Sequence, residues 1–357
     1  MLISGAVGPS FSDRAVTFSP SWTLVPTHWC RNTCGYCVFV EREGPRARLV
    51  SVEAARAEMR RARAAGAAEL LIMSGEGVEQ SAEVRAALRA EGCGSYVEYL
   101  ARVSREALGL GLLPHVNVGN VAEADARALA EFVPSMGMML ETADAGLRRK
   151  AAHRLAPDKE PARRLATLEA AGRARMPFTT GILVGVGEDA RSREDSLRAV
   201  AAIQRAHGHV QEVIIQPFTP HAGTAMADAP APSFAELRAA VEAARDILPA
   251  EVVVQVPPNL APRFVELVEA GARDLGGVSP DGDRINPLER WLAPRAYADA
   301  LGRAGFTLRP RLAVHERFVS PEWLRPLTLR AAADVRRSLP LLPEASADHA
   351  PAARAHV

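Results

Sequence analysis

The stretch FTTGILVGVGE, residues 178 to 188, begins with apolar and β-branched residues and ends with glycines and a carboxylate. Short apolar runs that end in glycine are typical of strands buried on both faces. The stretch that follows, Arg193–His207, has the spacing of an amphipathic helix. A strand followed by a helix is the unit of parallel sheets, so repetition of this pattern would predict an α/β fold.

The same alternation continues through most of the chain. Together with Phe178–Val184, the runs with strand character number eight; the other seven are Trp22–Val25, Leu70–Met73, Leu113–Val116, Met136–Leu140, Val213–Gln216, Val252–Val256 and Leu275–Val278. Further stretches with helical spacing are Val52–Ala65, Tyr96–Leu108, Ala122–Glu131, Pro161–Ala171, Phe234–Ile247 and Pro262–Ala270. This order predicts a TIM-like (β/α)8 barrel, and a partial (β/α)6 barrel with a C-terminal addition is the alternative.

Composition agrees with one barrel domain. The 357 residues are 48% apolar, and no break in composition divides residues 1–329, whereas residues 330–357 are expected to form a solvated tail. The formal charge of +1 favours a small, nearly neutral partner over nucleic acid or a membrane surface. Because no secretion signal or long apolar run is present, we expect a cytoplasmic protein with reduced thiols.

Polar residues follow each predicted strand. In a barrel, the carboxyl ends of the strands converge on one mouth, where the chemistry takes place. A single such residue would be explained as a cap or loop residue, but eight sets together predict a binding site. These sets are Cys30–Cys37, SGE at 74–76, HVN at 115–117, ET at 141–142, GVGE at 185–188, Gln216, QVPPN at 255–259 and SPDGD at 279–283.

The segment THWCRNTCGYC, residues 27 to 37, holds three of the four cysteines. Three thiolates leave one coordination position open for another ligand. In a reduced protein they suit either an iron–sulfur cluster or zinc, for which His28 is close enough to be the fourth ligand. Cys93 lies far from the others and is expected to be an ordinary small apolar residue.

The C-x3-C-aromatic-x-C spacing, with Tyr36 as the aromatic residue, resembles the signature of the radical S-adenosylmethionine (SAM) superfamily. The resemblance implies that Cys30, Cys34 and Cys37 hold a [4Fe-4S] cluster whose fourth iron binds SAM. One electron from such a cluster would break a C–S bond of SAM and yield methionine and a 5′-deoxyadenosyl radical.

Other segments resemble the SAM-binding segments of that superfamily, with Ser74 in place of the usual first glycine. Acidic and guanidinium groups suit the amino and carboxylate groups of SAM. The resemblance implies that Ser74, Gly75 and Glu76 form a SAM-binding segment, in which Glu76 accepts from the ammonium and Gly75 lets the backbone approach closely. It further implies contacts of Arg164 with the carboxylate, of Glu141 with the ribose, and of Gly181, Leu183, Gly185 and Glu188 along the adenine.

Longer segments between about Ser21 and Leu327 resemble the 7,8-didemethyl-8-hydroxy-5-deazariboflavin synthase (CofG subunit) family. They include VPTHWCRNTCGYCVF, GLLPHVNVG, SMGMMLET, HVQEVIIQPF, QVPPNLAP and GGVSPDGDRINP. The resemblance implies a lyase of ammonia-lyase type that forms Fo, the deazaflavin chromophore of coenzyme F-420. The implied substrate is the adduct of tyrosine's hydroxybenzyl group with 5-amino-6-(D-ribitylamino)uracil, supplied by a CofH-like sister enzyme. Hydrogen abstraction, ring closure and ammonia loss would follow.

Neutral polar residues at the mouth suit a substrate with a uracil edge and a ribityl chain. The candidates for substrate binding are Asn117, Gln216, Gln255 and Asn259. His115 is a candidate for proton transfer during cyclisation, and a satisfied barrel histidine is the alternative. Reduced ferredoxin or flavodoxin is the implied electron donor.

The chain departs from the family pattern after Gln216. Pro217 replaces an asparagine there, and His221 with Ala222 replaces Lys-Pro. Two other functions stay open: a related radical SAM enzyme, of CofH-like or menaquinone-pathway type, that acts on another aromatic adduct, and a non-catalytic metal-binding barrel.

Overall fold

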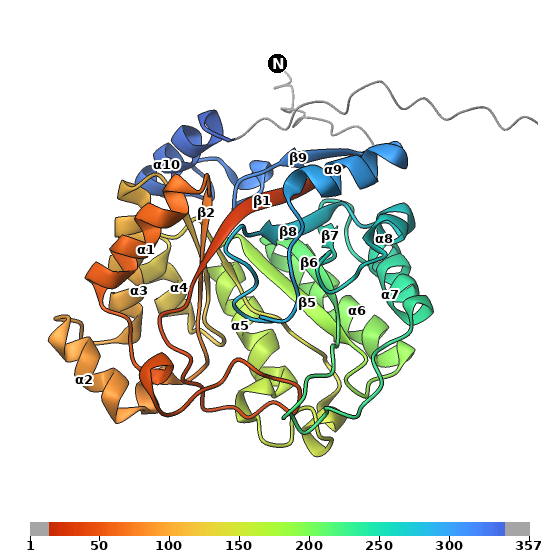
Figure 1. Cartoon of the computed structure of the whole chain (residues 1–357), viewed down its shortest axis with the longest axis horizontal. Coiled ribbons are helices and arrows are strands. Elements are labelled where there is room, and N and C mark those ends of the chain that lie inside the picture. Colours follow the sequence, from red (N-terminus) through yellow and green to blue (C-terminus); the bar gives the residue numbers. More distant parts are fainter. Residues whose placement is uncertain (1–13, 340–357) are drawn as a thin grey trace, which may run out of the picture.

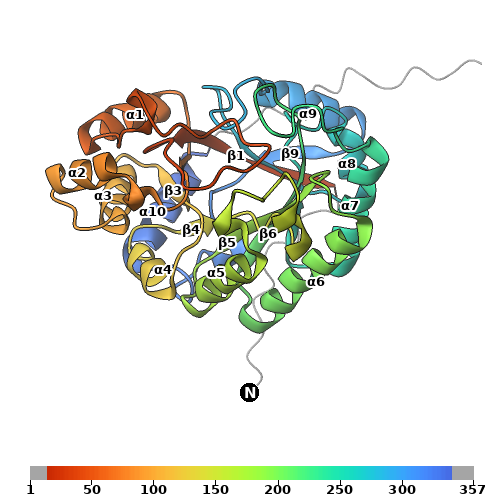
Figure 2. The same ribbon diagram turned by 90° about the horizontal axis from the view of Figure 1, so that it is seen from below.

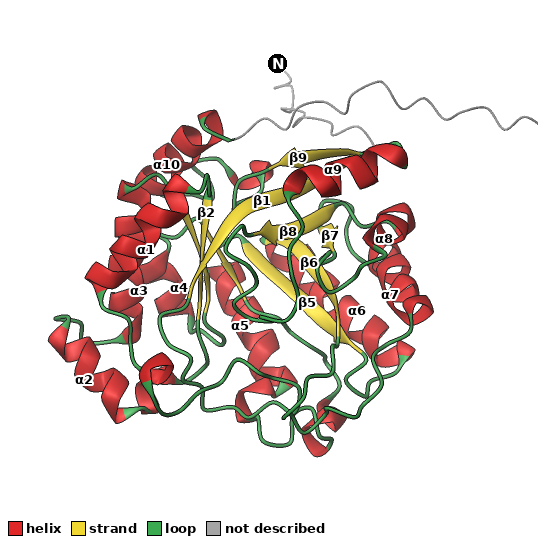
Figure 3. Cartoon of the chain, viewed as in Figure 1, coloured by secondary structure: helices red, strands yellow, loops and turns green. Residues whose placement is uncertain are grey.

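A closed parallel barrel forms the centre of the computed structural model, which describes residues 14–339 (Figures 1 and 3). Strand β1 pairs with both β2 and β8, and this closes the sheet. The eight-stranded barrel predicted from the sequence is therefore confirmed, and the six-stranded alternative is wrong. The strands are β1 (Ala15–Leu24), β2 (Glu69–Met73), β3 (Leu113–Asn117), β4 (Ser135–Gly137), β5 (Phe178–Val184), β6 (Val210–Pro217), β7 (Val253–Gln255) and β8 (Asp274–Val278).

Helices surround the barrel, as the view from below shows (Figure 2). Several begin at a serine or aspartate whose side chain accepts a hydrogen bond from a backbone N–H of the first turn, for example Ser51 and Asp189. Among the described residues, no helix is long and apolar enough to cross a membrane. The helices are α1 (Val52–Ala64), α2 (Ala82–Ala90), α3 (Tyr96–Gly109), α4 (Glu123–Leu129), α5 (Pro161–Arg173), α6 (Ala190–His207), α7 (Phe234–Ile247), α8 (Phe264–Ala270), α9 (Pro294–Arg303) and α10 (Pro326–Arg337).

The structure differs from the sequence-based expectation at both ends of the barrel. Strand β1 begins at Ala15 rather than Trp22, because Pro20 and alternating serines hide the strand pattern there. Helices α2, α9 and α10 and the short strand β9 (Thr307–Pro310) were not predicted. The expected boundary after residue 329 falls inside α10, whose Ala332 and Val335 are buried against the barrel. Residues 340–357 of the expected tail lie outside the described residues.

The chain after β9 crosses the amino-terminal ends of the strands and closes that end, which we call the floor. The Arg311 guanidinium donates to Asp274 at 2.6 Å and to Glu212 at 2.8 Å. The Ala313 carbonyl accepts from Ser135 and Gln211. Leu312, Val314 and Phe318 are buried beside these polar groups. Because the floor is filled, only the opposite end of the barrel remains open for a ligand.

Candidate functional site

The cysteine loop follows β1 and lies across the carboxyl end of the barrel, along the lower edge of the molecule in Figure 1. Backbone hydrogen bonds hold this loop from two sides. Thr33 N–H donates to the Leu155 carbonyl at 2.8 Å, and Arg31 N–H donates to the Glu76 carbonyl at 2.9 Å. Gly75 packs so closely on the loop that a Cβ there would lie 2.3 Å from Cys30 Cβ, so only glycine fits.

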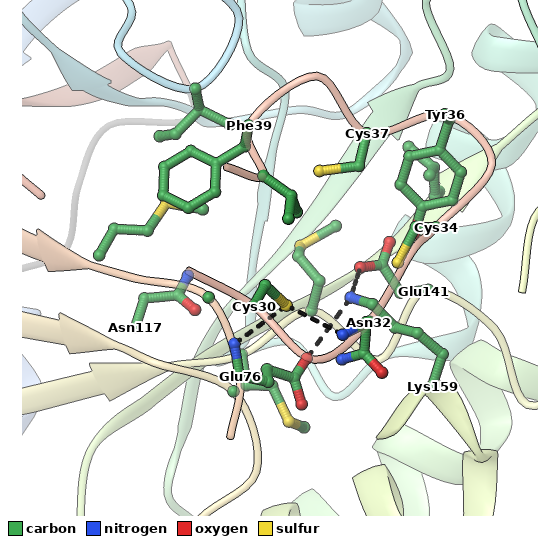
Figure 4. A pocket seen from close by; sticks show the side chains of 18 of the residues that line it. Cys30, Asn32, Cys34, Tyr36, Cys37, Phe39, Glu76, Asn117, Glu141 and Lys159 are labelled. Carbon is green, nitrogen blue, oxygen red and sulfur yellow. Dashed lines mark hydrogen bonds and ion pairs between the residues drawn. The ribbon is translucent and has the colours of Figure 1, made fainter. Parts of the chain in front are cut away.

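The three cysteines line one cavity, and their sulfur atoms face a common space (Figure 4). All three are free thiols. Burial raises the pKa of each thiol, that of Cys34 to about 12, so metal binding has to displace the protons. The backbone N–H groups of Glu76 and Asn32 donate to Cys30 Sγ at 3.2 and 3.4 Å. Such donors favour a metal-bound sulfur.

The spacing of these thiols does not suit a single zinc ion. With Zn–S bonds of about 2.3 Å, the sulfurs of a tetrahedral site lie about 3.8 Å apart. Among the described residues, the only three ligand groups within 4.8 Å of one another are Glu212, Asp274 and His315 of the floor. His28 is not a fourth ligand either, because its Nδ1 lies 2.9 Å from the Phe39 carbonyl and its ring packs on Phe39. The wider arrangement fits a cluster of several metal atoms.

Four charged side chains stand beside the cysteines and balance one another. Arg164 of α5 donates to Glu76 at 2.7 Å. Lys159 donates to Glu141 at 2.6 Å (Figure 4). Burial and Arg164 act to lower the pKa of Lys159, but Glu141 and Glu76 outweigh them and hold this pKa above its ordinary value. Burial raises the pKa of Glu141, but Lys159 and Arg164 outweigh it and the pKa is lowered. Lys159, Glu141 and Arg164 are therefore charged at neutral pH.

Sequence reasoning missed Lys159. Its segment, PDKEP, has no metal-ligand or phosphate-binding pattern. The lysine reaches the cavity because the turn before α5 returns to the cysteine loop, where Asp158 N–H donates to Asn32 at 3.1 Å. Its signal would have been its place five residues before Arg164, which the resemblance had already assigned to SAM.

Several buried polar atoms of this site have no partner. Arg164 is 1% exposed, yet its Nε and Nη1 donate to nothing, and Asn32 Nδ2 is also without an acceptor. Buried donors of this kind are normally satisfied, so they mark the place of a polar ligand. A ligand carboxylate beside Arg164 would satisfy its two unpartnered nitrogens, and an ammonium group of the same ligand could donate to the Glu76 carboxylate. The residues therefore fit the amino acid part of SAM next to the three cysteines.

The glycine-rich segment after β5 contributes less to the cavity than expected. Leu183 lines it, but Gly181, Gly185 and Glu188 do not. Gly181 allows close strand packing, because a Cβ there would lie 2.5 Å from the Ile214 carbonyl. The Glu188 carboxylate accepts from the N–H groups of Gly185 and Val186, each at 2.8 Å, and thus holds the turn itself. Adenine contacts through these three residues are not supported by their positions.

The neutral polar residues are divided between the cavity and its surroundings. Asn117 and Gln216 line the cavity as expected, together with Ile285 and Asn286 of the loop after β8, which sequence reasoning missed. Gln255 and Asn259 do not line it. The Gln255 amide packs on Gly276, whose added Cβ would lie 2.3 Å from Nε2, and Asn259 donates to Asp283 at 2.8 Å. Asn259 thus braces the loop that carries Asn286, and Gln255 packs on β8 before that loop.

His115 also lies outside the residues that line the cavity. Its Nδ1 lies 2.8 Å from the Ser135 hydroxyl, which donates to the Ala313 carbonyl of the floor. Burial lowers the pKa of His115, so the imidazole is neutral at neutral pH. The expected proton-transfer role is not supported by this position, because the side chain faces the interior of the barrel toward the floor. Because β3 is buried from Leu113 to Val116, its sequence pattern gave no indication of how deep in the barrel His115 lies.

Comparisons with known proteins agree with this site. Residues 24–200 match the model of the radical SAM superfamily. A 7,8-didemethyl-8-hydroxy-5-deazariboflavin synthase from Gloeobacter violaceus is 42% identical over 303 residues, which cover 85% of this chain and 91% of that protein. The enzyme of the same name from Methanothermobacter thermautotrophicus is 40% identical over 313 residues, which cover 87% of this chain and 95% of that protein.

Solved structures show the same fold at low sequence identity. The [FeFe]-hydrogenase maturase HydG has a TM-score of 0.68 with 15% identity, covering 91% of this chain and 78% of that one. Methylornithine synthase PylB has a TM-score of 0.63 with 19% identity, covering 84% of this chain and 85% of that one. These two structures support the fold alone. The curated relatives near 40% identity and the match to the superfamily model show that the chain belongs to the 7,8-didemethyl-8-hydroxy-5-deazariboflavin synthase family of the radical SAM superfamily.

Proposed function

We propose that this protein forms the deazaflavin chromophore Fo, in the pathway to coenzyme F-420, from the hydroxybenzyl adduct of 5-amino-6-(D-ribitylamino)uracil. The observation that carries the proposal is the identity of about 40% with named synthases across nearly their whole length. The cavity supports it, because three thiols, a charged pocket for SAM and neutral polar groups lie together in it.

Each group of residues has a separate task in this proposal. Cys30, Cys34 and Cys37 would hold the [4Fe-4S] cluster, and Arg164 with Glu76 would hold the amino acid part of SAM. When bound, the cluster and SAM supply the 5′-deoxyadenosyl radical that takes a hydrogen atom from the substrate. Asn117, Gln216 and Asn286 would hydrogen-bond the substrate, while buried Met138, Leu183 and Phe39 exclude water from the reacting atoms.

An anaerobic assay tests the reaction. The reconstituted protein is mixed with SAM, dithionite and the synthetic adduct, and products are read by mass spectrometry. We expect Fo, ammonia, methionine and 5′-deoxyadenosine, as an ammonia-lyase type of reaction requires. With free tyrosine and the diaminouracil, no Fo should form until a CofH-like enzyme is added. SAM cleavage without Fo would favour a related enzyme for another aromatic adduct, and zinc without sulfide would favour a metal-binding barrel.

We also propose that an acidic electron donor, such as reduced ferredoxin or flavodoxin in the cytoplasm, docks beside the cysteine loop. Residues 149–155 lie against the outer side of this loop, where Gly35 N–H donates to the Ala152 carbonyl at 2.8 Å. Arg149 and Arg154 are exposed there and form no ion pair with any residue in the described range 14–339, and Leu155, which follows Arg154, is 59% exposed. An apolar contact flanked by free cations suits an acidic partner.

Charge reversal tests this surface. Arg149→Glu with Arg154→Glu should slow turnover driven by reduced flavodoxin about tenfold or more at low salt, because both steering charges change sign. Turnover driven by dithionite should not change. The control is Arg309→Glu, an exposed residue of β9 at the floor end. Equal rates with flavodoxin in wild type and the double variant would overturn the proposed docking surface.

A further inference from the structure

One buried imidazole next to the cavity has no partner in the protein. His221 is 5% exposed, and no side chain or backbone group of the described residues hydrogen-bonds or pairs with its ring. Only its carbonyl is used, as an acceptor for Thr224 at 2.8 Å. Two other buried histidines, His115 and His153, bond to neighbouring side chains, and His209, whose ring nitrogens have no partner among residues 14–339, does not line the cavity or the recess. A neutral imidazole offers one donor and one acceptor, and both remain available at His221.

His221 lines a recess that opens from the main cavity. Tyr36, Leu183, Gln216 and Asn286 line both spaces and therefore stand at their junction. The recess measures about 30 Å³, which is room for one or two atoms but not for a ring. Its other walls are largely apolar: Pro217, Phe218 and Leu260. A single polar group of a ligand in the main cavity can enter this recess and meet the imidazole.

The loop that carries His221 is fixed to the cysteine loop. Met226 N–H donates to the Gly35 carbonyl at 2.9 Å, and Phe218 N–H donates to the Val184 carbonyl at 2.8 Å. The recess is thus placed at a constant position relative to the cysteines. Its polar groups are all uncharged apart from the titratable imidazole, so it suits a neutral carbonyl, hydroxyl or amino group better than a phosphate or carboxylate.

We propose that His221 is a substrate-binding residue whose imidazole hydrogen-bonds one neutral polar group of the substrate that projects into this recess. The inference rests on the proposed function, in which the substrate carries a pyrimidine ring and a ribityl chain. In either case the imidazole forms a hydrogen bond, with an oxygen or nitrogen of the ring or with a hydroxyl of the ribityl chain. It adds a third polar contact to those of Gln216 and Asn286.

Binding of the fluorescent product Fo to the reconstituted enzyme tests the proposal. Loss of one buried hydrogen bond weakens binding about five- to tenfold, so His221→Ala should raise the Fo dissociation constant and the KM for the adduct by that factor. His221→Gln, which keeps a donor and an acceptor, should recover part of the affinity. The iron content and SAM affinity of His221→Ala should equal those of wild type, which would show that its cluster and SAM sites are intact. His207→Ala, on the outer helix α6, is the matched control.

Binding of two ligands distinguishes a contact with the ring from a contact with the ribityl chain. If His221 contacts the ring, His221→Ala should weaken the binding of Fo and of its N10-methyl analogue, which lacks the ribityl chain, by the same factor. If His221 contacts the ribityl chain, only the affinity for Fo should fall. Unchanged affinity for both ligands, with unchanged KM, would overturn the role of His221. A wild-type enzyme that neither binds Fo nor converts the adduct would instead overturn the proposed function.

Discussion

Two buried arginines stand at opposite ends of the barrel, and they are used differently. At the floor, Arg311 bonds through Nε, Nη1 and Nη2 to Asp274, Glu212 and the Leu312 carbonyl. At the mouth, Arg164 bonds only through Nη2, to Glu76, and leaves two nitrogens without acceptors. A saturated network stabilises the fold, whereas an incomplete one has room for a ligand. The completeness of hydrogen bonding, more than burial or charge, separates the structural end from the functional end.

The largest effect should come from the mouth. Cys34→Ala removes one of three thiolates, so iron content should fall and SAM cleavage should be abolished. Cys93→Ala is the control, because Cys93 is a buried residue of the core away from the cavity and should leave both properties intact. Iron and sulfide analysis and 5′-deoxyadenosine formation measure the outcome. Full iron content and SAM cleavage in Cys34→Ala would show that the ligands are wrongly assigned.

The next largest effect should come from the floor. Arg311→Met leaves Asp274 and Glu212 buried without their cation, which costs about 3–5 kcal/mol of unfolding free energy. Urea unfolding followed by circular dichroism measures this, and Arg309→Met on the exposed side of β9 is the control. SAM affinity of the folded variant should not change. A stable Arg311→Met protein with weakened SAM binding would contradict the division between the two ends.

Removal of Arg164 at the mouth should lower SAM affinity, whereas removal of Arg311 at the floor should lower stability. Arg164→Ala should weaken SAM binding tens-fold or more, because a lost charged partner in a buried site costs about 2–5 kcal/mol. The cluster should still form. Arg163→Ala is the control, because Arg163 is the next residue in the chain but its side chain is 63% exposed. Calorimetric titration with SAM gives the dissociation constant, and unchanged affinity in Arg164→Ala would mean that SAM does not meet this residue.

The smallest effect should appear in acid. Burial raises the pKa of Glu212, but Arg311 and His315 outweigh it and hold the pKa below its ordinary value of 4.5. The folded pKa lies below the unfolded one, so this stabilisation is present above about pH 4.5 and is lost as the pH falls further. Urea unfolding between pH 7 and pH 3 should show a steeper acid loss for wild type than for Glu212→Gln. Parallel curves would exclude Glu212 as a source of that loss.

Much of the mouth could be predicted from the sequence because its signals are local. The spacing of Cys30, Cys34 and Cys37 and the neighbouring Gly75 and Glu76 occupy short segments, and each segment directly follows a strand. A barrel brings strand ends together whatever the loops contain, so these residues were expected to meet, and they do. The central strands and helices were likewise predicted, because their apolar periodicity is a property of ten or so adjacent residues.

The sequence by itself determined the barrel, the grouping of three cysteines in one loop and the family, because each depends on residues close together in the chain or on a pattern that repeats. Only the tertiary structure decided which polar residues reach the cavity. Lys159 was missed and His115, Gln255 and Asn259 were misplaced, because the depth and direction of a side chain depend on packing between distant segments. The same holds for Arg311, whose partners Glu212 and Asp274 come from two other strands. Long-range contacts of this kind leave no periodic trace in the sequence.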